Sequence, residues 1–256
     1  MTKTTLLGID TGGTFTDFVC YSNGAWKVHK VLSTPAEPQL AILKGIEDLG
    51  LTEAVRSGEV ALIHGTTVAT NAALEGKGVR TAYITNQGLK DVLRIGRQTR
   101  ASLYDLSPGP QGIPVDPELL FEISARLDAE GQVIKDLDVT ELSNLVEKIE
   151  ALGPEAVAIN LLFSFKDPGH ELAIEASLKE RYFVSRSSDV LPEYKEYERG
   201  VATWVNAWLG PLIRSYLNAL SEALSPAPIA IMQSSGLTIS ARQAANRAVN
   251  LLLSGP

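Results

Sequence analysis

The stretch that most constrains the fold of this chain is GIDTGGTFTD, residues 8–17. Residues 5–10 are mostly apolar and residues 15–21 are rich in β-formers, so the segment predicts a strand, a tight glycine turn and a second strand. A Walker A loop needs a Lys-Ser/Thr pair and a following helix, and the dinucleotide fingerprint needs another glycine spacing. Neither pattern occurs here, so the turn belongs to a different class.

A glycine turn of this kind has the chemistry to bind phosphate. Glycines let a ligand approach the backbone, and consecutive N–H groups form an anion-binding concavity. Asp10, at the end of the first strand, can hold hydrated Mg²⁺ or orient a nucleophile, so it is the candidate catalytic and metal-binding residue. The competing interpretation is an ordinary glycine-rich hairpin with Asp10 as a turn residue. The candidate cofactor-binding residues are Thr11, Gly12, Gly13, Thr14, Thr16 and Asp17.

The composition of the 256 residues favours a protein that acts on small molecules. The 23 Lys+Arg against 30 Asp+Glu give a net charge of −7, which argues against nucleic acid because phosphate binding needs a basic face. No run approaches the ~20 apolar residues of a membrane span, and the start, MTKTTLLGID, does not resemble a signal peptide. A single cysteine, Cys20, excludes an internal disulfide and is expected to be a buried, inert thiol. We therefore expect a cytoplasmic location.

Along the chain, apolar periodicity predicts alternating strands and helices, which is typical of an α/β protein with a largely parallel sheet. The predicted helix over 194–224 contains Gly210-Pro211, where a kink or a break is expected. The predicted strands are 5–10, 15–21, 25–31, 60–63, 80–85, 119–128, 156–163 and 229–232, and the predicted helices are 38–49, 66–75, 140–152, 168–182, 194–224 and 240–248.

Residues 97–117 carry four prolines and two glycines without periodicity, and so long a loop tends to be functional or to cross between subdomains. This loop suggests three segments. They are an N-terminal α/β core with the phosphate loop over 1–96, an inserted α/β subdomain over 97–192, and a long kinked helix with the start of a second lobe over 193–256.

Three further groups of residues are open to a functional and a structural interpretation. The run His64-Gly65-Thr66-Thr67 stands between a strand and a helix, where amides and hydroxyls favour an anion, or where Thr66 simply caps the helix and His64 packs in the core. Arg94, Arg97 and Arg100 suit carboxylate or phosphate, or form a solvated basic stretch. Glu196 and Arg199 form an i,i+3 pair on the long helix, or lie near a cleft.

The chain resembles the N-terminal region of the A-type subunit of the ATP-dependent hydantoinase/oxoprolinase family. The resemblance rests on GIDTGGTFTD followed by HGTTVATNAALEGKG, and then on TAYITNQGLKDVLRIGRQTR, LYDL, AINLLFSF, KDPGHE, LPEYKEYERG, IMQSSG and LLLSGP, which together extend over essentially the whole sequence. The family belongs to the actin/sugar-kinase/Hsp70-like (ribonuclease H-like) superfamily, whose first phosphate loop is this strand–Gly–strand hairpin.

The resemblance implies an ATP- and Mg²⁺-dependent amidohydrolase. ATP would phosphorylate the carbonyl oxygen of a cyclic amide such as a hydantoin or 5-oxoproline, and water would then open the ring with help from a B-type partner subunit. The resemblance also makes His64 a candidate catalytic residue. The candidate substrate-binding residues it implies are Gly65, Thr66, Thr67, Asn71 and Arg97.

Two alternatives stay open at this point: a subunit of an ATP-dependent ketone carboxylase, and a non-catalytic assembly lobe. Family chains normally continue past SGP with a second glycine-rich phosphate loop and an adenosine site, and SSGLTIS at 234–240 lacks an expected double glycine. We therefore expect half of an ATP site here, completed by a C-terminal lobe or a partner. The isolated chain is expected to be inactive.

Overall fold

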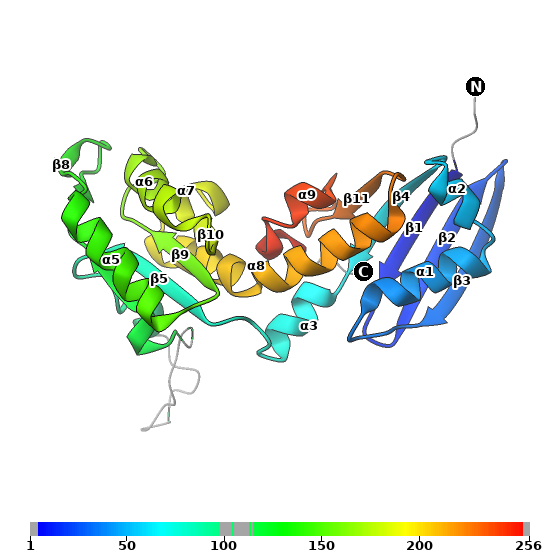
Figure 1. The fold of residues 1–256 in the computed structure, drawn as a ribbon, viewed down its shortest axis with the longest axis horizontal. Coiled ribbons are helices and arrows are strands. Elements are labelled where there is room, and N and C mark those ends of the chain that lie inside the picture. Colours follow the sequence, from blue (N-terminus) through cyan, green and yellow to red (C-terminus); the bar gives the residue numbers. More distant parts are fainter. Residues whose placement is uncertain (1–4, 98–103, 105–112, 114, 253–256) are drawn as a thin grey trace. The chain divides into compact units, whose positions relative to one another are not determined.

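The computed structural model describes residues 5–97, 104, 113 and 115–252. The chain forms two compact units (Figure 1): unit 1 comprises Met1–Gly78 and Leu212–Pro256, and unit 2 comprises Val79–Pro211. This division differs from the segments 1–96, 97–192 and 193–256 expected from the sequence. The physical reasons are that residues 81–86 pair with strands of unit 2, and that one long helix contributes to both units.

Unit 1 is built on a six-stranded sheet in the order β12-β11-β4-β1-β2-β3. The predicted strand–turn–strand is present, and a third antiparallel strand follows through an Asn23-Gly24 turn in which both residues have positive φ. Strands β4 and β11 run parallel to β1. The strands are β1 (Thr5–Thr11), β2 (Phe15–Ser22), β3 (Ala25–Leu32), β4 (Val60–Thr66), β11 (Ile229–Met232) and β12 (Thr238–Ser240).

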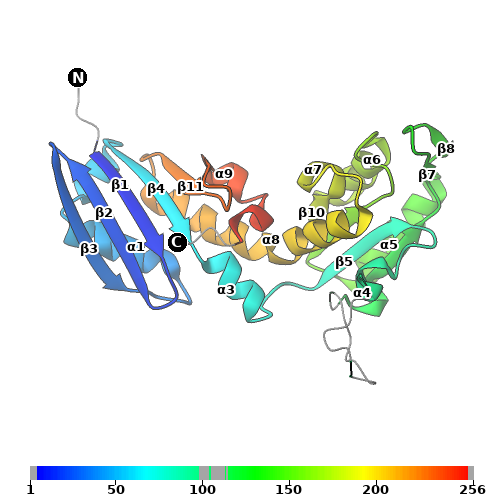
Figure 2. The ribbon, with the colours of Figure 1, turned by 180° about the vertical axis from the view of Figure 1, so that it is seen from behind.

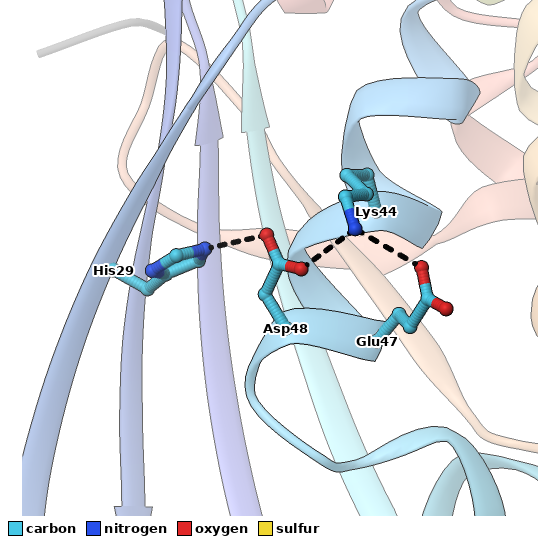
Figure 3. A network of polar contacts seen from close by, with 4 residues as sticks. All are labelled: His29, Lys44, Glu47 and Asp48. Atoms are coloured by element: carbon cyan, nitrogen blue, oxygen red, sulfur yellow. Dashed lines mark hydrogen bonds and ion pairs between the residues drawn. The ribbon is translucent and has the colours of Figure 1, made fainter.

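Helix α1 (Pro38–Asp48) packs on one face of β1, β2 and β3. Gly45 permits this close approach, since a Cβ there would lie 2.1 Å from Cζ of Phe18. At the helix end, Asp48 accepts from His29 Nε2 at 3.1 Å and pairs with Lys44 Nζ at 2.8 Å (Figure 3). These two partners lower the pKa of the Asp48 carboxyl, Lys44 more than His29. The network ties α1 to the edge strand β3.

The opposite face of this meander carries apolar side chains that are exposed. Leu6 is 45% exposed, Val19 43%, Trp26 72% and Val28 75%. Register places Val19 opposite Val28, and Trp26 opposite Tyr21, so the side chains form continuous rows across the strands. Figure 2 shows this side of β1, β2 and β3, and no helix of the described residues lies over it. Apolar side chains that gather on one exposed face are typical of interaction surfaces.

Unit 2 is a four-stranded parallel sheet in the order β10-β9-β5-β6. Every residue of β5 and β9 is buried, as expected for a parallel sheet covered on both faces. One face packs on α5 and α6, and the other on the first half of α8. The elements are β5 (Thr81–Asn86), β6 (Leu120–Ile123), β9 (Ala156–Asn160), β10 (Phe183–Arg186), α5 (Val139–Leu152) and α6 (Gly169–Leu178), with a small hairpin of β7 (Arg126–Leu127) and β8 (Val133–Lys135).

Helix α8 (Glu196–Leu224) is one continuous helix, so of the kink or break expected at Gly210-Pro211 the break is wrong. Packing overrides the local signal. Leu209, Ile213 and Leu217 on both sides of the proline are fully buried, and Gly210 lies against the ring of Phe183, where a Cβ would be 2.2 Å from Cζ. The two units divide at the same proline.

The remaining helical elements are short. They are α2 (Thr52–Arg56), α3 (Val68–Leu74), α4 (Val92–Ile95), α7 (Ser187–Val190), α9 (Ala241–Ala244) and the 3-10 turns Pro117–Leu119 and Ala248–Leu251. Within the described ranges, none of the helices has the length and apolarity that crossing a membrane requires.

Candidate functional site

The turn between β1 and β2 is stabilised by hydrogen bonds from Ser33, the residue that follows β3. Ser33 Oγ donates to the carbonyl of Gly12 at 2.8 Å, and Ser33 N donates to the carbonyl of Thr14 at 2.9 Å. The amide of Gly12 is already used, since it donates to Phe15 O at 3.0 Å. In the described part of the chain, the amides of Gly13 and Thr14 have no partner. The turn therefore offers two consecutive free N–H groups, which is the arrangement that binds anions.

The backbone conformation does not require either glycine, and space is tight only at Gly12. Neither Gly12 nor Gly13 has a positive φ. A Cβ on Gly12 would lie 3.1 Å from Phe15 O, and a Cβ on Gly13 would lie 3.6 Å from Nδ2 of Asn71. A side chain at Gly13 would thus enter the space between the turn and Asn71.

The other residues predicted to bind the cofactor lie in different environments. Thr16 is fully buried and its Oγ1 lies 2.9 Å from Ser33 Oγ; because the Ser33 hydrogen is directed at Gly12 O, Thr16 is the donor and stabilises the turn. Asp17 pairs with Lys30 Nζ at 3.0 Å, and Thr14 is exposed at the tip. Thr11 is only 3% exposed, below the turn. Of the hydroxyls predicted to bind phosphate, that of Thr14 lies at the surface of the turn.

Asp10 lies near the C-terminal end of the interior strand β1, opposite Asp17 on β2 and Gly65 on β4. Its Oδ1 is buried without a hydrogen-bond partner. Gly65 provides the room, since a Cβ there would lie 3.4 Å from this oxygen. Burial raises the pKa of the Asp10 carboxyl, and the Asp17 carboxylate raises it further. A buried carboxylate oxygen without a partner is suited to a hydrated cation or to a water that it orients.

His64 lies in the core of unit 1. It is fully buried, and its Nε2 is 2.6 Å from the hydroxyl of Tyr216 on α8. Burial lowers the pKa of His64 to about 4, so the imidazole is neutral near pH 7. Burial raises the pKa of the Tyr216 hydroxyl, and the nearby hydroxyls of Thr66 and Thr11 lower it by less. The structure therefore places His64 in a buried polar cluster beneath the turn, without access to solvent.

A pH dependence of stability follows from this burial. The unfolded chain binds a proton at His64 near pH 6.5 and the folded chain near pH 4, so stability rises with pH between these values. This pKa difference corresponds to about 3 kcal/mol, lost as pH falls from 6.5 to 4. Urea unfolding measures the free energy of unfolding of the wild type and of His64→Gln across this range. The difference between the two should decrease by up to about 3 kcal/mol as pH falls. A constant difference would contradict the assignment of a buried neutral imidazole.

The segment after β4 is tied to the end of β1. Thr67 N and Oγ1 both donate to the carbonyl of Thr11, at 3.1 and 3.0 Å, and Asn71 Nδ2 donates to Thr67 Oγ1 at 3.3 Å. The N-cap of α3 is Thr67, whereas the structural interpretation of the sequence assigned Thr66. Thr66 is fully buried and accepts from Val68 N at 3.2 Å. Of this group, Asn71 is the side chain left facing the turn.

A cavity of about 230 Å³ adjoins the turn within unit 1. Thr11, Gly12 and Gly13 form one end with Thr67 and Asn71. The polar residues that the sequence did not indicate are Ser33, Thr34 and the Glu75–Lys77 pair, whose charged atoms are 2.5 Å apart. Pro35, Pro38, Val68, Ala72 and Leu212 provide an apolar wall. A space of this size suits a phosphoryl group or a small ring, because sites for drug-sized ligands are typically ~300–1,000 Å³.

The arginines expected to bind anions belong to unit 2 and have partners there. Arg94 pairs with Asp91 at 3.3 Å and Arg97 pairs with Glu198, while Arg100 lies outside the described residues. Arg199 does not form the expected i,i+3 pair with Glu196.

The reason is that Arg199 is fully buried and has other acceptors. Its guanidinium donates to Asn160 Oδ1 at 3.0 Å and to the carbonyls of Glu193 and Leu161, each at 2.7 Å. These contacts account for Arg199 as a structural residue of unit 2.

Solved structures share this fold. Over 99% of the chain, it superposes on a nucleotide-free structure of acetone carboxylase with a TM-score of 0.84 and 24% identity, which establishes the mixed α/β fold. The crystal structure of the ATP-dependent caprolactamase from Pseudomonas jessenii gives a TM-score of 0.82 at 32% identity over 98% of the chain. These matches span 39% and 38% of the respective solved chains.

Two family models match the sequence: the hydantoinase/oxoprolinase N-terminal region over residues 6–182 and hydantoinase/oxoprolinase over 199–256. The chain belongs to the hydantoinase/oxoprolinase family, as its motifs predicted. It is 34% identical to caprolactamase subunit alpha of Pseudomonas jessenii over 98% of its own length, and 32% identical to 5-oxoprolinase 1 of Arabidopsis thaliana over 97%. It spans 38% and 22% of these two relatives.

Proposed function

We propose that this chain contributes the phosphate-binding lobe of an ATP-dependent enzyme that opens a cyclic amide. The observation that carries the proposal is the turn after β1, which leaves the amides of Gly13 and Thr14 free and follows Asp10, whose buried Oδ1 has no hydrogen-bond partner. The ATP-dependent caprolactamase among the similar structures supports the choice of substrate class. The order β3-β2-β1-β4-β11 supports an actin-like lobe.

The chemistry requires activation because resonance makes a ring amide a poor electrophile. In the proposed reaction the carbonyl oxygen takes the terminal phosphoryl group of ATP, with cleavage of the bond to ADP. One water then adds to the carbonyl carbon and the ring C–N bond breaks, with the nitrogen leaving as the protonated amine. A second water hydrolyses the resulting acyl phosphate to the carboxylate and inorganic phosphate. The amides of Gly13 and Thr14 bind and orient the phosphoryl oxygens, and positioning supplies most of the catalysis in such transfers.

Asp10 fits a magnesium site with water and phosphate as further ligands. Mg²⁺ usually takes only one or two carboxylates and keeps several waters. Across the described ranges there is no cluster of three or more His, Cys, Asp or Glu side chains that would hold a metal by protein ligands alone. When bound, Mg²⁺ would neutralise charge on the phosphate oxygens.

The second candidate function is the ATP-dependent carboxylation of a ketone, whose oxygen would be phosphorylated in the same way. It is considered because the chain is also 27% identical to the acetophenone carboxylase gamma subunit of Aromatoleum aromaticum. The deciding experiment is ATP hydrolysis by the enzyme that contains this chain, measured with a panel of lactams and ketones. Lactam-stimulated hydrolysis with ring opening supports the amidohydrolase. Ketone stimulation alone would contradict it.

We propose that a B-type partner subunit binds the exposed apolar face of β1, β2 and β3, since two of the relatives are subunits of larger enzymes. The nucleotide site itself needs more than this chain, since the cavity of about 230 Å³ is small for a whole nucleotide. We expect the isolated chain to fold, to show no ATPase activity and to bind Mg-ATP no tighter than about millimolar, roughly −4 kcal/mol. Calorimetric titration with and without the partner measures this, and micromolar binding by the chain alone would contradict the half-site.

A further inference from the structure

Asn71 is the side chain that faces the phosphate-binding turn across the cavity. It lies in α3, one helical turn after Thr67. Its Nδ2 is the nearest atom to the position of a Cβ on Gly13, at 3.6 Å. A ligand group bonded to this carboxamide is therefore next to the free amides of Gly13 and Thr14.

The hydrogen bonds of Thr67 fix which way the Asn71 carboxamide points. The Thr67 hydroxyl has one hydrogen, which it donates to Thr11 O at 3.0 Å, so the Asn71 atom 3.3 Å from it must be a donor. This assigns Nδ2 to the side facing Thr67. Nδ2 keeps a second hydrogen, and Oδ1 has no hydrogen-bond partner among residues 5–97 and 115–252. The side chain thus presents one free donor and one free acceptor.

That pair complements the edge of a cyclic amide. In a small-ring lactam the amide is cis, so its N–H and C=O lie side by side on one edge and can form two hydrogen bonds with a primary carboxamide. A ketone offers only the acceptor. The ring methylenes would contact the apolar wall of Pro35, Pro38, Val68 and Ala72.

We propose that Asn71 recognises the N–H/C=O edge of a cyclic amide and makes the site select lactams over ketones. This inference rests on the proposed function. It places the lactam oxygen at Nδ2, beside the phosphate-binding amides, and the lactam N–H at Oδ1. Sites built to hydrogen-bond a substrate reject analogues that lack the group, because a buried polar atom is then left unpaired.

The test uses three matched six-membered rings as acceptors: 2-piperidone, N-methyl-2-piperidone, which lacks the N–H, and cyclohexanone. Substrate-stimulated ATP hydrolysis by the active enzyme containing this chain gives kcat/KM for each. We expect the wild type to prefer 2-piperidone over its N-methyl form by about 10- to 100-fold. In Asn71→Leu, kcat/KM for 2-piperidone should fall to the level of the N-methyl form. The ratio between the two lactams should then approach one.

Leu74→Ser is the matched control, because Leu74 lies on the same helix and is 82% exposed. It should keep the wild-type ratio. An unchanged ratio in Asn71→Leu, or equal use of both lactams by the wild type, would overturn the role of Asn71 while leaving the proposed function intact. Absence of stimulation by any lactam in the wild type would instead refute the proposed function, and this inference with it.

Discussion

Gly13→Val is expected to lower kcat/KM for ATP-dependent turnover at least ~1,000-fold while leaving the protein folded. The added side chain would stand in front of the amides of Gly13 and Thr14, and the loss of a single preorganised donor already costs about 100- to 1,000-fold. The fold should tolerate it, because φ at Gly13 is not positive and a Cβ would meet only Asn71 Nδ2, at 3.6 Å. Steady-state ATP hydrolysis with a lactam, together with a thermal unfolding curve, measures both effects.

Gly13→Ala provides a graded control for this prediction. A single methyl group at 3.6 Å from Asn71 makes an ordinary van der Waals contact, so the alanine variant should retain more activity than the valine variant. Wild-type turnover in Gly13→Val would refute a phosphate site at this turn. A large loss of stability in that variant would show instead that the turn has little free space.

Asp10→Asn is expected to lower kcat at least ~100-fold with a smaller change in KM. A carboxylate that holds Mg²⁺ or orients the attacking group acts mainly in the transition state, so its loss appears in kcat. The amide cannot carry the negative charge, although it has nearly the same shape. Full kinetics in ATP and lactam would measure the two constants, and wild-type activity in the Asp10→Asn enzyme would reduce Asp10 to a turn residue.

The pH profile provides a second measurement of the same carboxyl group. Burial and the Asp17 carboxylate raise the pKa of Asp10 above the usual 3.8, so the ionised form is lost at a higher pH than for an ordinary aspartate. The wild-type kcat/KM, which reports the ionisation of the free enzyme, should therefore decline as pH falls through that raised value. In Asp17→Asn the repulsion is absent, so the acid limb should move to lower pH. An acid limb at the same pH in Asp17→Asn would show that a group other than Asp10 causes this limb.

Much of the fold could be predicted from local sequence. The GIDTGGTFTD segment specified β1, the turn and β2, because alternating apolar residues and paired glycines leave few other structures. Buried apolar runs correctly indicated the positions of β5 and β9. Pro211 does not split helix α8, because the helix is stabilised by packing along both halves, and a local rule contains no information about that packing.

The candidate site could be predicted only in outline. Sequence reasoning indicated the turn, and it also named Thr16 as a cofactor-binding residue and His64 as a catalytic residue. In the structure Thr16 is hydrogen-bonded to Ser33, and His64 is hydrogen-bonded to Tyr216. Ser33 could have been suspected as a polar residue at the end of the third strand. Tyr216 had no comparable signal, since its position fitted the apolar pattern of the long helix.

The sequence by itself determined the strand–glycine–strand turn, the α/β class and the family, because these depend on periodicity and on motifs of consecutive residues. Only the tertiary structure decided which groups of the turn are free. Ser33 reaches Gly12 from 21 positions away and Tyr216 reaches His64 from 152 positions away. Each such bond uses a polar group that the sequence alone leaves available to a ligand. Folding thereby leaves the Gly13 and Thr14 amides, Oδ1 of Asp10 and Oδ1 of Asn71 free for chemistry.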